Sequence, residues 1–185
     1  IYQITTNYLT AELFDLKFAQ SADVMYITHP NHEVSKLERT GHTSWTLTEV
    51  AFTDGSYLSA NTTATTMTPG SAGVGTGISL AASAITGING GSGFLSTDVG
   101  RLINFSAGYA KITAVGSTTA ATIQILDAFD GTSAVTTWKL GAFSDTTGHP
   151  SSVSFFQQRL VFAGTTNEPQ TLYFSKSGDY ENMTS

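Results

Sequence analysis

The sequence predicts an all-β protein, in which an antiparallel meander, propeller-blade-like and incomplete, is interrupted by an inserted small β-barrel or sandwich. Two observations predict this class. The 185 residues include 30 Thr, 20 Ser and 18 Gly, and Thr favours pleated backbone whereas Ser and Gly favour turns. Charged residues make up only 12% of the chain, about half of what soluble domains usually carry. None of them lies in the 43 residues between Asp54 and Asp98, so an uncharged middle divides the chain.

The first part of the chain predicts a short helix followed by three strands. Thr10 is a suitable cap, and Leu13, Phe14, Lys17 and Phe18 follow with a short apolar stripe at helical spacing. The period then changes to two, with tight turns between short runs, which is typical of an antiparallel meander. The strands expected here are residues 24–29, 34–39 and 45–50.

The middle of the chain predicts a flexible arm and then a separate small β-domain. Residues 59–77 have no usable periodicity and are expected to be the arm. Five short β runs with turn signals between them then suggest a barrel or sandwich over residues 78–142. The runs are residues 78–81, 101–105, 109–115, 122–126 and 135–140.

Meander-like sequence resumes in the last part of the chain, over residues 152–156, 159–163 and 170–175. An aromatic residue and a Gln precede an apolar strand here, as they do ahead of residues 24–29, so a three-strand unit is repeated. Residues 1–58 and 143–185 are therefore expected to form one discontinuous, propeller-like domain. A propeller needs at least four blades, and the chain begins with Ile1 and not with Met. We therefore expect an internal fragment of a longer protein.

Composition excludes several function classes. The chain has no cysteine, so it has no disulfide, no thiolate zinc site and no cysteine nucleophile. A net charge of −6 argues against a grip on phosphate backbones, which needs clustered Lys and Arg. No run approaches about 18 apolar residues, so no membrane-spanning segment is expected.

Two motifs suggest ligand binding, and a plainer interpretation is favoured for both. His29, His32 and Glu33 form H-x-x-H-E, but Pro30 interrupts the spacing and no third ligand is signalled, so a polar turn and no metal site are expected. The glycine-rich residues 73–77 lack the Lys-Ser/Thr of a phosphate-binding loop and are expected to be a hinge.

No catalytic or cofactor-binding residue is predicted, no cofactor is expected, and the chain is not expected to be an enzyme. The chain has no G-x-S-x-G motif, although a triad assembled from distant parts stays open. Two carboxylates flank an expected hairpin turn, and two tryptophans sit in alternating strands, where core packing is expected. The residues considered are His29, His32, His42, His149, Asp127, Asp130, Trp45 and Trp138.

Five segments of the chain carry a resemblance to a known family. They are FAQSADVMYITHP (residues 18–30), DVGRLI (98–103), WKLGAFS (138–144), PSSVSFFQQRLVFAG (150–164) and PQTLYFSKSGDYEN (169–182). The first and the last two resemble the opening and central signatures of the tail tubular protein B or nozzle group of short-tailed phages and prophages, and the other two resemble parts of a domain inserted in that family.

This resemblance implies a structural virion protein. Family members are several times longer, contain a propeller-like part and form a ring of six copies at the end of the tail, around the channel through which DNA leaves. The expected partners are further copies of the protein, the tail adaptor and fibre proteins, with DNA passing through unbound. Assembly would take place in the host bacterial cytoplasm and the product would lie in the virion.

Two other functions stay open. The Thr-rich β pattern and the 11% of aromatic residues are also compatible with a carbohydrate-binding or host-adhesion module of a phage or surface protein. A hydrolase is the third possibility, and no motif marks it.

Overall fold

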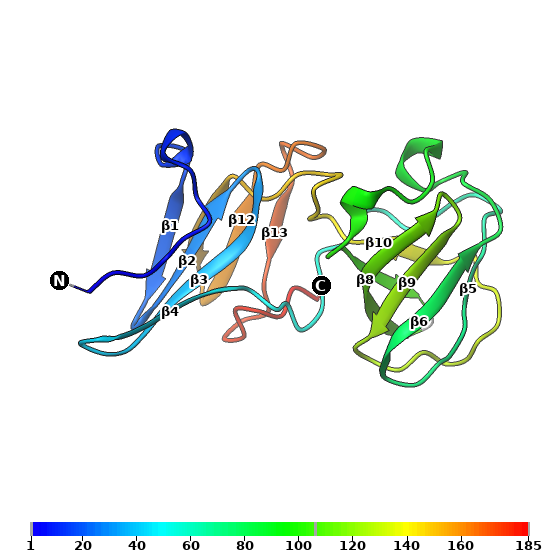
Figure 1. The fold of residues 1–185 in the computed structure, drawn as a ribbon, viewed down its shortest axis with the longest axis horizontal. Coiled ribbons are helices and arrows are strands. Elements are labelled where there is room, and N and C mark those ends of the chain that lie inside the picture. The colour runs from blue at the N-terminus through cyan, green and yellow to red at the C-terminus, as the bar shows by residue number, and fades with distance from the viewer. Residues whose placement is uncertain (1, 106, 185) are drawn as a thin grey trace. The chain divides into compact units, whose positions relative to one another are not determined.

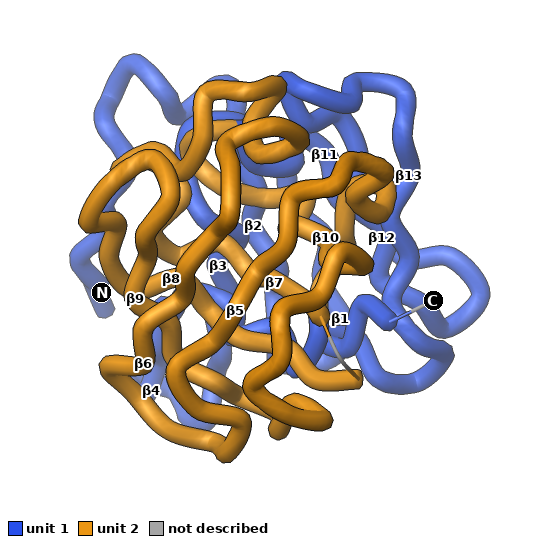
Figure 2. Tube along the Cα trace, turned by 90° about the vertical axis from the view of Figure 1, so that its right-hand side faces the viewer, with its two compact units in different colours: residues 1–54, 147–185 blue, residues 55–146 orange. Residues whose placement is uncertain are grey.

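The computed structural model describes residues 2–105 and 107–184 and confirms the all-β class. Every pair of neighbouring strands in its three sheets is antiparallel. The chain forms two compact units, residues 1–54 with 147–185 (unit 1) and residues 55–146 (unit 2), as Figure 2 shows. Unit 1 is thus discontinuous, and we expected the divisions at 58/59 and 142/143. Among the described residues, no helix is long and apolar enough to cross a membrane.

The first sheet of unit 1 is a four-stranded meander in chain order (Figure 1). Its strands are β1 (Lys17–Ser21), β2 (Val24–His29), β3 (His32–Gly41) and β4 (Ser44–Glu49). The turns between them contain only two residues each, because Ser21 pairs with Val24, His29 with His32 and Gly41 with Ser44. The three strands expected from the sequence are present.

The prediction of a helix near the N-terminus is wrong beyond the first helical turn. Only a 3₁₀ helix, η1 (Thr10–Glu12), forms there, and Lys17 and Phe18 belong to β1. They pair with Thr28 and Ile27 of β2, so the ladder satisfies their backbone groups. A helix this short is marginal by itself, because its nucleation is costly, and the hairpin with β2 prevails.

The second sheet of unit 1 is a three-stranded meander of β11 (Ser152–Phe156), β12 (Arg159–Ala163) and β13 (Leu172–Phe174). Strand β11 packs against β1 and β2, and the rings of Tyr26 and Phe155 meet edge to face at 6.1 Å between centroids. The buried apolar residues of this unit are Tyr26, Ile27, Val34, Val50, Val153, Leu160, Phe162, Tyr173 and Met183.

Unit 2 is built on one six-stranded sheet in the order β10-β7-β8-β9-β6-β5, which curls around its core (Figure 1). The strands are β5 (Met67–Pro69), β6 (Gly75–Ala82), β7 (Leu102–Phe105), β8 (Gly108–Ser117), β9 (Ala120–Ile125) and β10 (Trp138–Leu140). Two 3₁₀ helices, η2 (Asn89–Gly91) and η3 (Ser96–Asp98), lie between β6 and β7.

Residues 59–77, expected to be a flexible arm, belong to unit 2 and contain β5 and the start of β6. Met67 explains this difference, because its side chain is fully buried in the core and its backbone exchanges hydrogen bonds with Val135. Asn61 also orders the segment, since its side chain bonds to the carbonyls of Thr63, Thr65 and Thr136.

The turn between β11 and β12 generates a stability prediction. Gln157 and Gln158 both have positive φ, 47° and 59°, in a two-residue turn, which non-glycine residues adopt at a cost. Replacing them by Asn-Gly, the preferred pair for such turns, should raise the free energy of unfolding by about 1 kcal/mol. Urea denaturation measures this change.

A matched control is the turn Thr118-Thr119 between β8 and β9, where neither residue has a positive φ. Asn-Gly at this turn should give no gain in stability. An equal gain at both turns, or none at Gln157-Gln158, would show that backbone strain is not the cause.

Candidate functional site

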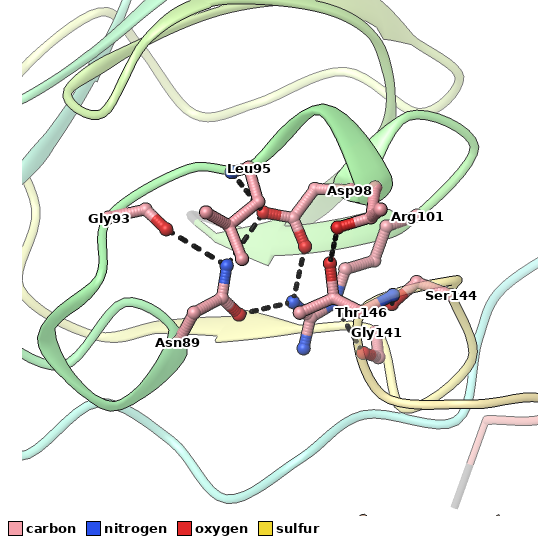
Figure 3. A network of polar contacts seen from close by, with 9 residues as sticks. Asn89, Gly93, Leu95, Asp98, Arg101, Gly141, Ser144 and Thr146 are labelled. Carbon is pink, nitrogen blue, oxygen red and sulfur yellow. Dashed lines mark hydrogen bonds and ion pairs between the residues drawn. The ribbon is translucent and has the colours of Figure 1, made fainter.

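In each unit we consider one cluster of polar side chains as a candidate site. In unit 2 the cluster is centred on Arg101, the residue before β7 (Figure 3). Arg101 and Asp98 are both fully buried. Arg101 Nη1 donates to Asp98 Oδ1 at 2.8 Å and to Asn89 Oδ1 at 2.7 Å, and Nε donates to the carbonyl of Gly141 at 2.7 Å. The guanidinium therefore joins three separate stretches of the chain.

The carboxylate of Asp98 makes further hydrogen bonds. Its Oδ2 accepts hydrogen bonds from Asn89 Nδ2 at 2.7 Å and from the backbone N–H of Leu95 at 2.9 Å. Burial lowers the pKa of the Arg101 guanidinium, and the Asp98 charge opposes that effect. Arg101 Nη2 is buried in the same network and has no hydrogen-bond partner. The other contacts join Asn89, Asp98 and Gly141 through the guanidinium and so order these parts of the chain.

Two of the segments singled out in the sequence, residues 98–103 and 138–144, meet in this network. Residues 98–103 supply Asp98 and Arg101, and residues 138–144 supply the carbonyl of Gly141. The Asp-x-x-Arg spacing places acid and base side by side at the end of η3, with Gly100 at a φ of 92° between them.

In unit 1 the cluster consists of Glu12, His29 and His32. The turn Pro30-Asn31 pairs His29 directly with His32 across the β2–β3 hairpin, and their ring centroids are 4.9 Å apart. Side chains that are directly opposite in an antiparallel pair project from the same face. The two imidazoles are therefore neighbours because of the turn.

Glu12 comes from η1 and completes the cluster. Its Oε2 lies 2.9 Å from His32 Nε2 and accepts the backbone N–H of Leu9 at 2.8 Å. The bond from Leu9, followed by that from His32, holds the pKa of the Glu12 carboxyl below its ordinary value. One potential ligand atom from each of the three residues lies within 4.8 Å of the others. Among the residues that the structure describes, Glu12, His29 and His32 form a group that is close enough to share a metal ion.

Two polar atoms beside this cluster are buried without a hydrogen-bond partner, His29 Nε2 and the Tyr8 hydroxyl. His29 is only 1% exposed, and its other nitrogen, Nδ1, accepts the backbone N–H of Asn31 at 3.1 Å. The Tyr8 ring lies edge-on to His32 at 5.2 Å and 6.4 Å from the His29 ring. Unpartnered buried polar atoms are rare in folded proteins and call for an explanation.

The H-x-x-H pattern does lie in a turn between strands, but Pro30 brings the histidines together where we expected it to separate them. Glu33, the acid next to them in the sequence, is not part of the cluster, and Glu12 takes that place. A two-residue hairpin turn would have been the signal for the histidine pair. No local pattern identifies Glu12, because its position depends on how the N-terminal segment folds over the hairpin.

The other histidines are separate from this cluster. His42 is exposed in the turn between β3 and β4, and its carbonyl accepts the indole N–H of Trp45. His149 is buried, and its backbone N–H donates to the carbonyl of Pro30. Neither residue belongs to the group of Glu12, His29 and His32 that could hold a metal ion.

The tryptophans have different environments. Trp138 is buried in the core of unit 2, where its indole donates to the carbonyl of Thr65. Trp45 lies half-buried on the edge strand β4, with the Arg39 guanidinium 5.9 Å from its ring, so it is not the core residue we expected.

The remaining candidates lie in unit 2. Asp127 Oδ1 accepts the backbone N–H of Ala128 and Asp130 lies three residues further on, so the pair follows β9. Residues 73–77 include the first three residues of β6, Gly75 to Gly77, and Gly77 has a φ of 70°.

The buried network generates a second prediction. Asp98→Asn and Arg101→Met should each lower the free energy of unfolding by about 3–5 kcal/mol, because each leaves a buried charge uncompensated. The double variant should lose less than the sum, with a coupling of about 1–3 kcal/mol. Chemical denaturation of the three variants measures the cycle.

The matched control pair is Lys36 and Glu181, whose charges are 2.8 Å apart but partly exposed. Lys36→Met and Glu181→Gln should each cost no more than about 1 kcal/mol. Similar costs at both pairs would contradict a special role for the buried network.

Comparison with known proteins does not assign a family. No family model matches this sequence, and no curated protein matches it either. The resemblance seen in the sequence therefore stays a prediction, and the function is argued below from the fold and from the surfaces of the described residues.

Proposed function

We propose that this chain is part of a structural virion protein, a tail nozzle or tubular protein of a short-tailed phage, whose copies form a ring around the DNA-ejection channel. The observation that carries the proposal is where the family-like segments lie in the fold. Residues 18–30 contain β2 and all of β1 except Lys17, residues 150–164 contain β11 and β12, and residues 169–182 contain β13. Three of the five family-like segments thus lie in strands of the two sheets of unit 1, and the other two lie in unit 2.

The form of these sheets supports the same proposal. Both are plain antiparallel meanders in chain order, which is the arrangement within a propeller blade. Propeller blades of this kind stack with further blades, so unit 1 has the form expected for part of a larger ring-like domain.

Several large apolar side chains of unit 1 are exposed to solvent. Phe14 is 92% exposed, and Phe18 and Phe156 are 54% and 58% exposed. The last two lie on β1 and β11, which pack against each other. Exposed apolar groups of this kind are typical of surfaces that become covered in an assembly, which agrees with contacts between copies or with other tail proteins.

The charge of the chain suits a DNA conduit. It carries 14 acidic against 8 basic side chains, and weak repulsion of phosphates would let DNA pass without being held. Hexameric assembly, contact with the tail adaptor and fibres, and a location in the virion follow from the family resemblance and are part of the proposal.

The proposal predicts that peptides of this chain occur in purified virions and that antibodies to it label the tail. In the protein encoded by the complete reading frame, Phe14→Ser with Phe156→Ser should reduce incorporation into particles at least tenfold, because an apolar contact is lost. Quantitative mass spectrometry of particles measures this. Val74→Ser, at a position 68% exposed in unit 2, is the matched control and should leave incorporation unchanged.

Absence of the protein from the tail would contradict the proposal. So would saturable glycan binding on an array that is lost on Trp45→Ala, since that result would instead support the carbohydrate-binding or adhesion module. Hydrolytic activity that a single Asp or Glu substitution removes would instead support an enzyme.

A further inference from the structure

We propose that Glu12, His29 and His32 bind a zinc ion, which fastens the N-terminal segment to the tip of the β2–β3 hairpin. The three side chains come from two places in the sequence, and they supply two imidazole nitrogens and one carboxylate oxygen. This inference is independent of the proposed virion function, because it rests only on these groups and on their surroundings in unit 1.

The ligand set selects the metal. Imidazole suits zinc and other first-row transition metals, whereas calcium and magnesium prefer oxygen ligands alone. Two histidines and one carboxylate are a known zinc ligand set that leaves a fourth position for water. The chain has no cysteine, so His and acidic residues are its available zinc ligands.

The present geometry needs only small adjustments to hold the ion. Zinc–nitrogen and zinc–oxygen bonds of about 2.0–2.2 Å place neighbouring ligands of a tetrahedron roughly 3.3–3.5 Å apart. His32 Nε2 and Glu12 Oε2 are 2.9 Å apart and must open slightly, whereas the widest separation, which is at most 4.8 Å, must close. Rotation about the side-chain torsions of Glu12 and His32, both partly exposed, provides movements of this size.

The unpartnered nitrogen of His29 is the second, independent observation. His29 Nε2 is buried, and no protein group satisfies it, so the fold retains a polar atom there at an energetic cost. A metal ion would satisfy this nitrogen in the ring tautomer that carries its proton on Nδ1. Tyr8, whose ring contacts both imidazoles, places a second unpartnered polar atom at the cluster, its hydroxyl.

One contact weakens the site and limits its affinity. His29 Nδ1 accepts a hydrogen bond from the Asn31 backbone, so in the neutral ring the proton lies on Nε2. Binding zinc through Nε2 would move that proton to Nδ1 and break the Asn31 bond. With this cost and three protein ligands, we expect weaker binding than in a four-ligand structural zinc site.

The structural effect follows from how little else holds η1 in place. None of its three residues is buried, and the following Leu13 and Phe14 are exposed. The contacts between this segment and the hairpin include the ion pair of Glu12 with His32 and the ring contacts of Tyr8. Zinc would therefore act as a clip for a segment that has little apolar anchoring.

The test is calorimetric titration of the untagged 185-residue chain, first freed of metal with a chelator, with zinc chloride. We expect one zinc per chain, and at least a tenfold loss of affinity for Glu12→Gln and for His32→Gln. Both positions are partly exposed, so these variants keep the core intact, whereas substitution of the buried His29 would also disturb packing. His42→Gln removes an exposed histidine that lies outside the cluster and is the matched control. This variant should bind zinc with the affinity of the unsubstituted chain.

Cobalt gives an independent readout. Co²⁺ bound by the unsubstituted chain should show the visible absorption of a tetrahedral site, and His32→Gln should remove it. The proposal is overturned if the unsubstituted chain takes up no zinc, or if Glu12→Gln and His32→Gln bind zinc as tightly as the His42→Gln control.

Discussion

The register of the β2–β3 hairpin is the constraint on which both the core and the candidate site of unit 1 depend. The turn Pro30-Asn31 pairs His29 with His32, and a β-bulge between Ile27 and His29 shifts the ladder by one residue, so that Tyr26 pairs with Lys36. Strand β2 is buried along Tyr26, Ile27, Thr28 and His29, so both of its faces are covered. Where both faces are buried, alternation of polar and apolar residues does not determine the register, and the turn together with the β-bulge before His29 has to do so.

The same register explains why polar groups occur in the interior of unit 1. Thr28 and His29 are buried at the end of a strand that begins with apolar residues, and each has an atom without a hydrogen-bond partner. A shift of the β2–β3 pairing by one residue would exchange the faces of the sheet on which Tyr26 and Ile27 lie. The position of the imidazole pair is therefore a consequence of the packing that the turn imposes.

Unit 2 is stabilised differently, by an apolar core and one buried ionic network. The uncharged run of the sequence ends at Asp98, and Arg101, three residues later, is its buried partner. Throughout the run, Asn and Thr side chains bond to nearby backbone, as Asn61 does with the carbonyls of Thr63 and Thr65. A chain poor in charge can thus keep its loops ordered, because amides and hydroxyls satisfy the backbone groups that the sheet leaves free.

Strands were predictable where period-two alternation was bounded by turn residues, as for β2, β11 and β12. Strand β1 was missed because Lys17 and Phe18 also fit a helical stripe, and pairing with β2 decided between the two. Strand β5 was missed because it is short and lies in a Thr-rich stretch, where Met67 is the residue that reaches the core. His29 and His32 could be found from their spacing, but Glu12 could not, since its place depends on tertiary contacts with the hairpin.

The most direct test of the hairpin register is a set of nuclear Overhauser effects across β2 and β3 in the isolated chain. The register described above predicts backbone contacts between His29 and His32 and between Tyr26 and Lys36. Contacts that instead join His29 to Glu33, with Tyr26 shifted by one residue to Leu37, would contradict it, because both the core of unit 1 and the histidine pair would then be assembled differently.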